Sequence, residues 1–320
     1  MNSRRTLLAA PAVLALPASA QENYPSRAIT GVTGYAPGGV TDVSGRAIAE
    51  RMSRELGVPV VIENRVGAAT AVANTHVAQA RPDGYTLLMG TSTLAINPGL
   101  QPNLTPRDPM RELVPVGMMY RTAFALHVHP SLPVRSTAEF IAYCRANPGR
   151  VNFGSSGTGA VNHLAQALLA HRTGIDVVHV PFRGGAPALM ELRTGRIHAM
   201  FQALLEAIPT LREGSTRGLG ISSAERNALL PDLPPVAEAV PGFEAVFWQG
   251  VFAPAGTPEA VVRKLGAALA AATSDAALRS RMAEQGVELI TGDAAYLRDL
   301  LARETAMWGE LIRGAQIRAE

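Results

Sequence analysis

Two glycine-rich turns constrain the fold of this chain more than any other feature of its sequence. The first covers residues 35–42 and contains Pro37-Gly38-Gly39, and the second covers residues 154–159. Each follows a short apolar segment with the pattern of a strand and precedes a segment with the apolar period of a helix. Such a turn presents backbone N–H groups at the positive end of a helix dipole, where anions bind. Because the turns lie more than a hundred residues apart in the chain, we expect two lobes that share one cleft.

Strand and helix patterns alternate along most of the chain, which predicts an α/β fold. Strands are predicted at residues 29–33, 58–63, 86–89, 151–153, 177–180 and 197–201. Helices are predicted at residues 42–56, 70–80, 137–146, 161–170, 186–193 and 204–212. This alternation is typical of βαβ units and favours a mostly parallel sheet.

The remaining segments suggest how the lobes are connected. A proline-rich stretch at residues 97–115 interrupts the alternation, and residues 116–128 have the pattern of an extended segment that crosses between lobes. Further extended segments lie at 217–221 and 247–253, followed by helices at 259–272, 276–285 and 294–312. We therefore predict a discontinuous first lobe, residues 21–123 and 247–320, and a second lobe, residues 124–246.

The N-terminal residues have the pattern of a secretory signal. Arg4 and Arg5 precede an apolar run, and Ala18-Ser19-Ala20 forms a cleavage site of the A-x-A type. We expect a signal peptide at residues 1–20 and a mature chain that begins near Gln21. The paired arginines also resemble a twin-arginine signal, so both the Sec and the Tat route stay open. Either route predicts export from the cytoplasm.

Charge and composition exclude several functions. Without the two signal arginines, the 29 basic residues fall to 27 against 26 acidic ones, so we expect no nucleic-acid partner. Cys144 is the only cysteine, and we expect a buried apolar residue rather than a reactive thiol. His127 and His129 share one face of an extended segment, but without a third ligand nearby they are interpreted as structural histidines. We expect no metal, no cofactor and a monomer.

The first turn has the residue types of an anion site. Gly38 and Gly39 let the backbone approach a ligand closely, because neither carries a Cβ atom. Pro37 fixes the turn, and Thr41 or Asp42 is placed to cap the helix that follows.

Two further turns add hydroxyl donors at strand ends. The second turn contains Ser155, Ser156 and Thr158, and residues 90–93 contain Thr91 and Ser92. The ends of the strands of an open α/β sheet lie on one rim, where ligands bind. Arg183, at the next strand end, adds a positive charge, and together these groups predict a site for a small carboxylate.

Other readings of these motifs are less well supported. A dinucleotide site needs Gly or Ala where Asn162 follows Gly157-x-Gly159. An exported hydrolase that uses Ser156 or Ser92 is kept as an alternative, although neither serine lies in a G-x-S-x-G elbow. A partner of a signalling receptor that binds the same ligands is a second alternative. We assign no catalytic residue and expect that the protein is not an enzyme.

Seven short motifs, in this order, resemble the solute-binding proteins of tripartite tricarboxylate transporters, the Bug family of Gram-negative bacteria. They are Tyr24-Pro25-Ser26-Arg27, Tyr35-Ala36-Pro37-Gly38-Gly39 with Thr41-Asp42, Glu63-Asn64-Arg65, Pro82-Asp83-Gly84-Tyr85-Thr86-Leu87, Asn152-Phe153-Gly154-Ser155-Ser156-Gly157, His179-Val180-Pro181-Phe182-Arg183-Gly184 and Phe252-Ala253-Pro254-Ala255-Gly256-Thr257-Pro258. The resemblance spans the whole mature chain.

The resemblance implies a two-lobed periplasmic binding protein of type II, with a mixed sheet flanked by helices in each lobe and the ligand cleft between the lobes. It implies a periplasmic protein that closes on a di- or tricarboxylate or an aromatic acid and delivers it to integral-membrane permease subunits. The ligand contacts that it implies are Tyr35, Ala36, Pro37, Gly38, Gly39, Thr41, Asp42, Thr91, Ser92, Ser155, Ser156, Gly157 and Thr158, with His163, Arg183, Gln202 and Trp248 as pocket walls.

Three departures from the family pattern affect the expected ligand. Gln202 stands where many relatives carry Asp, which leads us to expect that an amino-acid ligand is disfavoured. Residues 64–69 replace a smaller Pro-Gly-rich loop at the cleft. Val40 replaces Ser or Thr and removes one hydroxyl.

Overall fold

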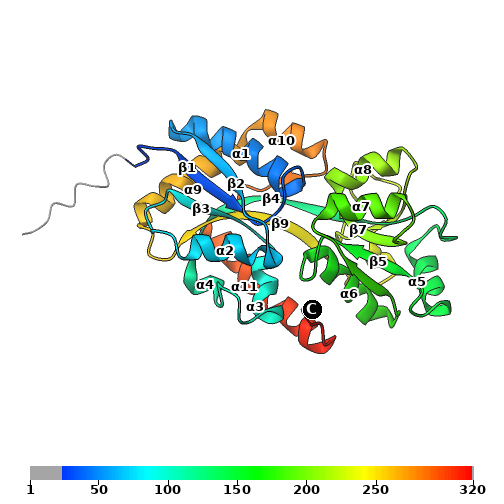
Figure 1. Cartoon of the computed structure of the whole chain (residues 1–320). Coiled ribbons are helices and arrows are strands. Elements are labelled where there is room, and N and C mark those ends of the chain that lie inside the picture. The colour runs from blue at the N-terminus through cyan, green and yellow to red at the C-terminus, as the bar shows by residue number, and fades with distance from the viewer. Residues whose placement is uncertain (1–23, 319–320) are drawn as a thin grey trace, which may run out of the picture.

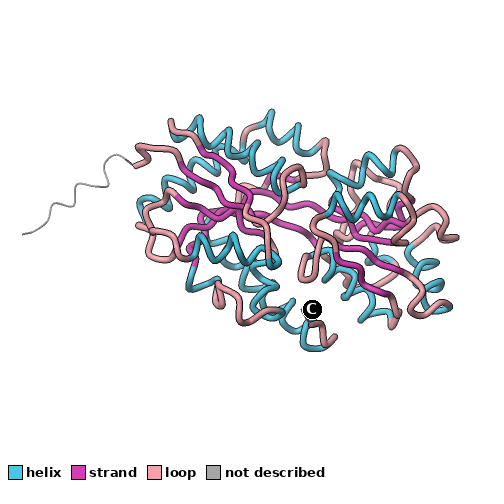
Figure 2. The backbone as a smooth tube through the Cα atoms, in the orientation of Figure 1, coloured by secondary structure: helices cyan, strands magenta, loops and turns pink. Residues whose placement is uncertain are grey.

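The computed structural model of the protein describes residues 24–318, so the predicted signal peptide lies outside the described residues. Figures 1 and 2 show two groups of helices and strands that are joined by long strands. None of the helices in residues 24–318 combines the length and apolar character that a membrane crossing requires.

The first group contains the first glycine-rich turn. Its parallel strands are β1 (Ile29–Thr33), β2 (Val60–Asn64) and β3 (Thr86–Thr91), with β1 in the middle. Ile29 and Val32 are fully buried, as expected for a parallel strand that is covered on both faces. The helices are α1 (Val40–Leu56), α2 (Ala71–Ala78), α3 (Thr93–Leu100), α4 (Pro109–Glu112), α9 (Glu259–Ser274), α10 (Ala276–Ala283) and α11 (Ala294–Gly314), with a short 3₁₀ helix at Ala68–Thr70.

The second group contains the second glycine-rich turn. Strand β5 (Asn152–Ser155) lies between β6 (Val178–Pro181) and β7 (Ala199–Ala203), and all three are parallel. The rings of Phe140, Phe153 and Phe201 contact one another in its core. Its remaining elements are α5 (Thr137–Ala146), α6 (Val161–Thr173), α7 (Gly185–Arg193), α8 (Leu204–Arg212), β8 (Arg217–Ile221) and a 3₁₀ helix at Val236–Glu238.

Two strands, β4 (Leu113–Val128) and β9 (Val246–Pro254), run between the groups (Figure 1). Residues Leu113–Ala123 of β4 pair with β9, whereas Phe124–Val128 pair with β7. Strand β9 also pairs with β3, and the short β10 (Glu288–Leu289) pairs with β4. The boundaries that divide the lobes after residue 123 and before residue 247 stay a prediction, and this change of partner along β4 supports them.

The predicted α/β class is confirmed, but the sheet is mixed rather than mostly parallel. Strands β4, β8, β9 and β10 form the antiparallel pairs, because the chain runs out along β4 and returns along β9. Helix α3 begins before the proline-rich stretch and extends into it, with Pro98 inside the helix, and its pattern was not recognised in the sequence.

Two predictions about single residues are confirmed. Cys144 is fully buried and free, and burial raises the pKa of its thiol to about 12. His127 is also fully buried, its Nδ1 lies 3.1 Å from Thr216 Oγ1, and burial lowers its pKa to about 3. Both residues are therefore part of the core.

Candidate functional site

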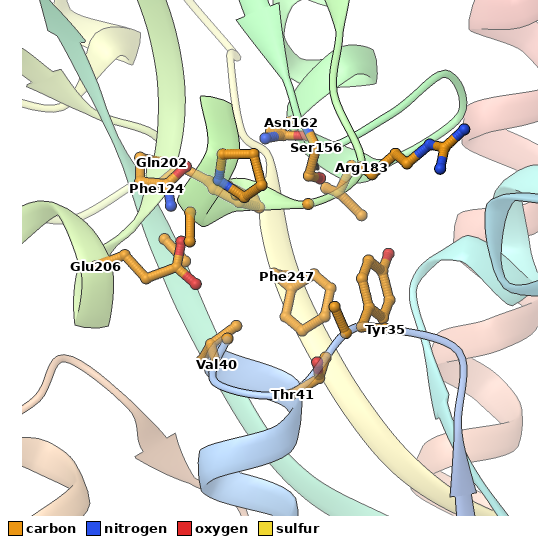
Figure 3. Close-up of a pocket in the computed structure, with 18 of the residues that line it drawn as sticks. Tyr35, Val40, Thr41, Phe124, Ser156, Asn162, Arg183, Gln202, Glu206 and Phe247 are labelled. Atoms are coloured by element: carbon orange, nitrogen blue, oxygen red, sulfur yellow. Dashed lines mark hydrogen bonds between the residues drawn. The ribbon is translucent and has the colours of Figure 1, made fainter. Parts of the chain in front are cut away.

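A cavity of about 230 Å³ lies between the two groups, at the first glycine-rich turn. Phe124 of β4 and Phe247 of β9 contribute aromatic wall, and their ring centroids are 6.3 Å apart in an edge-to-face arrangement. Figure 3 shows the labelled side chains around this space. The lining residues are Tyr35, Ala36, Pro37, Gly39, Val40, Thr41, Phe124, Ser156, Val161, Asn162, Arg183, Gly184, Gly185, Ala186, Pro187, Gln202, Ala203, Glu206 and Phe247.

The first turn is held by Asp42 from inside helix α1. Gly38 has a φ of +89°, a value that favours glycine, and Gly39 is the N-cap residue of α1. The Asp42 carboxylate accepts hydrogen bonds from Gly38 N at 3.1 Å, Arg46 Nε at 3.0 Å and Asn64 Nδ2 at 2.9 Å. Burial alone would raise the pKa of Asp42, but these bonds hold it below its usual range. The prediction that Thr41 or Asp42 is the cap is therefore wrong, since Asp42 lies one turn further and reaches back.

The second turn is also closed by its own hydrogen bonds. Gly157 N donates to Ser155 Oγ at 3.2 Å, and Ser155 Oγ lies 2.6 Å from His179 Nε2. The rings of His179 and His163 stack at 3.8 Å, and burial lowers their pKa values to about 4 and about 3. These contacts fix the shape of the turn rather than present it to a ligand.

The N–H groups of Gly38 and Gly157 therefore have acceptors within the chain, and neither residue lines the cavity. The expectation that both amides face a ligand stays a prediction, and in this structure local side chains accept their hydrogen bonds. In the second group, the helix starts that reach the cavity include that of α6, through Val161 and Asn162, and that of α7, whose N-cap residue Gly184 has a φ of +130°. Sequence reasoning named Arg183 in this loop but not the helix start that follows it.

The predicted contacts separate into two sets. Those that line the cavity are Tyr35, Ala36, Pro37, Gly39, Thr41, Ser156, Arg183 and Gln202. Those that do not are Gly38, Asp42, Thr91, Ser92, Ser155, Gly157, Thr158, His163 and Trp248. Thr91 supports a lining residue from behind. Burial raises the pKa of Tyr35 to about 12, and hydrogen bonds from the hydroxyls of Thr91 and Thr93, which are 2.8 Å apart, oppose this effect.

Trp248 lies on the face of β9 that points away from the cavity. Successive side chains of a strand point to opposite faces, so Phe247 lines the cavity and Trp248 does not. Trp248 instead lines a separate cavity with Glu304 and Trp308 of α11. The residue of β9 that lines the cavity at this point is therefore Phe247, the neighbour of the predicted Trp248.

Glu206 and Asn162 are polar cavity residues that sequence reasoning missed, and Glu206 is the charged one. It lies in the first turn of α8, four residues after Gln202, and its carboxylate points across the cavity toward Val40 (Figure 3). Burial raises the pKa of Glu206 to about 6, and the backbone N–H of Val40 acts in the opposite direction. The signal in the sequence was an acidic residue directly after a buried strand end.

The two serines of the hydrolase alternative have no histidine partner within residues 24–318. Ser156 Oγ donates to Asn162 Oδ1 at 2.9 Å, and Ser92 Oγ accepts from Trp248 N at 3.0 Å. Ser155 does lie against His179, but it is fully buried and does not line the cavity. This geometry gives no support to a serine nucleophile at either predicted position.

Comparison with known families gives one match that covers most of the chain. The model of the TctC family, described as "Tripartite tricarboxylate transporter family receptor", matches residues 44–317. The chain belongs to this family. Among its TctC relatives, BugT of Bordetella pertussis is 33% identical over 314 residues, which cover 97% of this chain and 96% of BugT.

Solved structures of TctC relatives have the same fold. BugD is 29% identical with a TM-score of 0.85 over 93% of this chain and 100% of BugD. A Rhodopseudomonas palustris protein solved with adipate is 34% identical with a TM-score of 0.87, over 92% of this chain and 99% of that one. MatC from the same species, with bound malate, is 34% identical with a TM-score of 0.85, over 90% and 100%. The predicted family and the periplasmic binding protein fold are confirmed.

Proposed function

We propose that this protein is a periplasmic receptor that captures a small organic carboxylate between its lobes and delivers it to the permease subunits of a tripartite tricarboxylate-type transporter. The observation that carries the proposal is a cavity with hydrogen-bond donors from both sides of the crossing strands. Thr41 and the start of α1 come from one side, and Ser156, Arg183 and Gln202 come from the other. The adipate and malate in the related structures support a carboxylate.

The lining residues from the predicted set are the proposed ligand contacts. Hydrogen bonds to a charged acceptor contribute about 1.5–3 kcal/mol each, so four of them gross about 6–12 kcal/mol, a range that includes the ~8 kcal/mol of a micromolar complex before association costs are subtracted. The residues behind them, among them Asp42 and Ser155, hold the two turns in place.

Lobe closure supplies the signal to the transporter in this proposal. A ligand that contacts both lobes stabilises the closed arrangement over the open one, and a hinge at β4 and β9 lets one lobe move against the other. Permease subunits then recognise a surface that exists only in the closed form. We propose that residues 1–20 direct export by Sec or Tat and are then removed, and that the mature receptor is a monomer.

A ligand panel tests this function. The mature chain is unfolded, dialysed and refolded to remove any bound molecule, and is then screened by thermal shift against mono-, di- and tricarboxylates and aromatic acids. Hits are measured by calorimetry, and by scattering for compaction on binding. A ligand at a hundredfold excess over its Kd stabilises the protein by about 2.7 kcal/mol. The absence of any carboxylate hit would refute the proposal.

A pair of arginine variants tests the site. Arg183 lines the cavity just before α7, whereas Arg193 lies near the end of α7 and pairs with Glu213 at 3.8 Å. Arg183→Ala should weaken carboxylate binding by about tenfold, because one charged donor is lost. Arg193→Ala should bind as the wild type does. Equal affinities of the two variants would place the carboxylate elsewhere.

A further inference from the structure

The proposed carboxylate cavity already contains one carboxylate, that of Glu206. A Cβ atom built on Gly39, the N-cap residue of α1, would lie 3.3 Å from Glu206 Oε1. A Cβ atom built on Gly185, at the start of α7, would lie 2.5 Å from Glu206 Oε2. Glu206 therefore reaches from α8 to the starts of two other helices, one on each side of the cavity.

Glu206 has no cationic partner among residues 24–318, in which no ion pair of this side chain occurs. Arg183 lines the same cavity but lies on its opposite side (Figure 3). The side chains near Glu206 include those of Phe124, Val40 and Pro187, none of which carries a charge, and the partner of the Glu206 carboxylate there is the backbone N–H of Val40. A half-buried carboxylate in such surroundings is stabilised by a cation that enters with the ligand.

Gln202 gives a second, independent sign of an absent ligand group. Its side chain is 1% exposed and lines the cavity, and its Nε2 has no acceptor in the described part of the chain. A Cβ atom on Gly185 would lie 2.7 Å from this Nε2, so the amide donor and the Glu206 acceptor are neighbours. A buried donor without an acceptor costs free energy, which a ligand oxygen would restore.

We propose that the ligand is a small carboxylate that also carries an ammonium group, with Glu206 as the acceptor for the ammonium and Gln202 and Arg183 as donors to its oxygen atoms. This inference rests on the proposed function. The presence of Gln202 in place of Asp led us to expect that an amino-acid ligand is disfavoured. Because Glu206 supplies the negative charge that position 202 lacks, we propose instead that such a ligand is favoured.

Net charge is the physical reason for the selectivity. A ligand with carboxylates alone places its negative charges beside Glu206 in a cavity of about 230 Å³, where little water screens them. A ligand ammonium next to Glu206 turns this repulsion into a charge pair. Close charge pairs across desolvated interfaces are strong enough to change affinity by about tenfold or more.

A ligand series that differs at one carbon tests the inference. Succinate, malate and aspartate carry hydrogen, hydroxyl and ammonium at that carbon, and glutarate with glutamate and adipate with 2-aminoadipate extend the series in length. Affinities are measured by calorimetry at pH 7.5 for the wild type and for Glu206→Gln. The matched control is Glu213→Gln, because Glu213 caps the C-terminus of the same helix and lies outside the cavity.

In the wild type and in the Glu213→Gln control, we expect the ammonium-bearing member of the best-fitting pair to bind about tenfold or more tightly than its partner. In Glu206→Gln this preference should fall to near unity or reverse. Equal binding of malate and aspartate would overturn the inference, since a hydroxyl donor would then suffice. Tighter binding of the plain dicarboxylate by the wild type would overturn it too, while leaving the proposed function intact. If no carboxylate of either kind binds, the proposed function itself fails.

Discussion

Replacing Glu206 by glutamine should make the ligand-free protein more stable, and the gain should grow with pH. Burial raises the pKa of Glu206 from 4.5 to about 6. One pKa unit corresponds to about 1.4 kcal/mol, so the ionised side chain costs the folded state about 2 kcal/mol. Because the folded state holds this proton more tightly than the unfolded state, the contribution of Glu206 is fully present below pH 4.5 and is lost as the pH rises through about 6.

The variant avoids this loss, since glutamine carries no charge at any pH. The linkage relation gives Glu206→Gln an advantage of roughly 1 kcal/mol at pH 5 and about 2 kcal/mol at pH 8. Urea unfolding followed by circular dichroism at half-unit intervals between pH 5 and pH 8 measures it. The quantity to compare at each pH is the unfolding free energy of the variant minus that of the wild type, because this difference removes contributions that both proteins share.

Three buried histidines make this subtraction necessary. Burial lowers the pKa of His127, of His163 and of His179, so the unfolded state binds more protons than the folded state below about pH 6.5. Their effect is that stability falls as the pH falls, which opposes the effect of Glu206. A flat difference for Glu206→Gln, or a variant that is less stable at pH 8, would refute the reasoning.

Three further substitutions test other parts of the structure. Ser155→Ala should cost about 1–3 kcal/mol in urea unfolding, because it leaves His179 Nε2 and a buried N–H group without their partner, and a cost near zero would contradict the closed second turn. Gly185→Ala should weaken ligand binding in calorimetry by about tenfold with a stability change under about 1 kcal/mol, since its Cβ meets only the ends of the Glu206 and Gln202 side chains. Unchanged affinity would contradict this geometry. Burial raises the pKa of Glu304 to about 7. Between pH 5 and pH 8, Glu304→Gln should therefore gain more stability relative to the wild type than Glu206→Gln does, and a smaller gain would contradict that burial.

Local features of the fold could be predicted from the sequence because they depend on neighbouring residues. Gly38 and Gly157 have φ values of +89° and +135°, and a glycine at such a position is visible in the sequence. The apolar period places α1 and α6 directly after the two turns, where they are found. Residues 116–128, which have an extended pattern in the sequence, all lie in β4, which begins at Leu113.

The site depends on contacts that no local pattern encodes. The N–H groups of the two turns were expected to be free, yet the side chains of Asp42 and Ser155 accept them, and the sequence does not distinguish this role from that of a helix cap or a ligand donor. Strand β9 is apolar on both faces, so alternation could not decide whether Phe247 or Trp248 faces the cavity. Glu206 comes into the cavity only because α8 lies opposite α1, which is a consequence of how the crossing strands place the two groups.

The position of Glu206 also links stability to selectivity. A carboxylate held in a poorly hydrated cavity destabilises the empty protein, and this cost is returned only when a ligand supplies a matching cation. Glu206→Gln should therefore gain stability and lose discrimination between matched ligands in the same molecule. A residue kept only for packing would not produce both effects, because its replacement by an isosteric amide would leave ligand preference unchanged. A gain in stability together with a loss of ligand discrimination distinguishes a residue that binds the ligand from one that only packs in the structure.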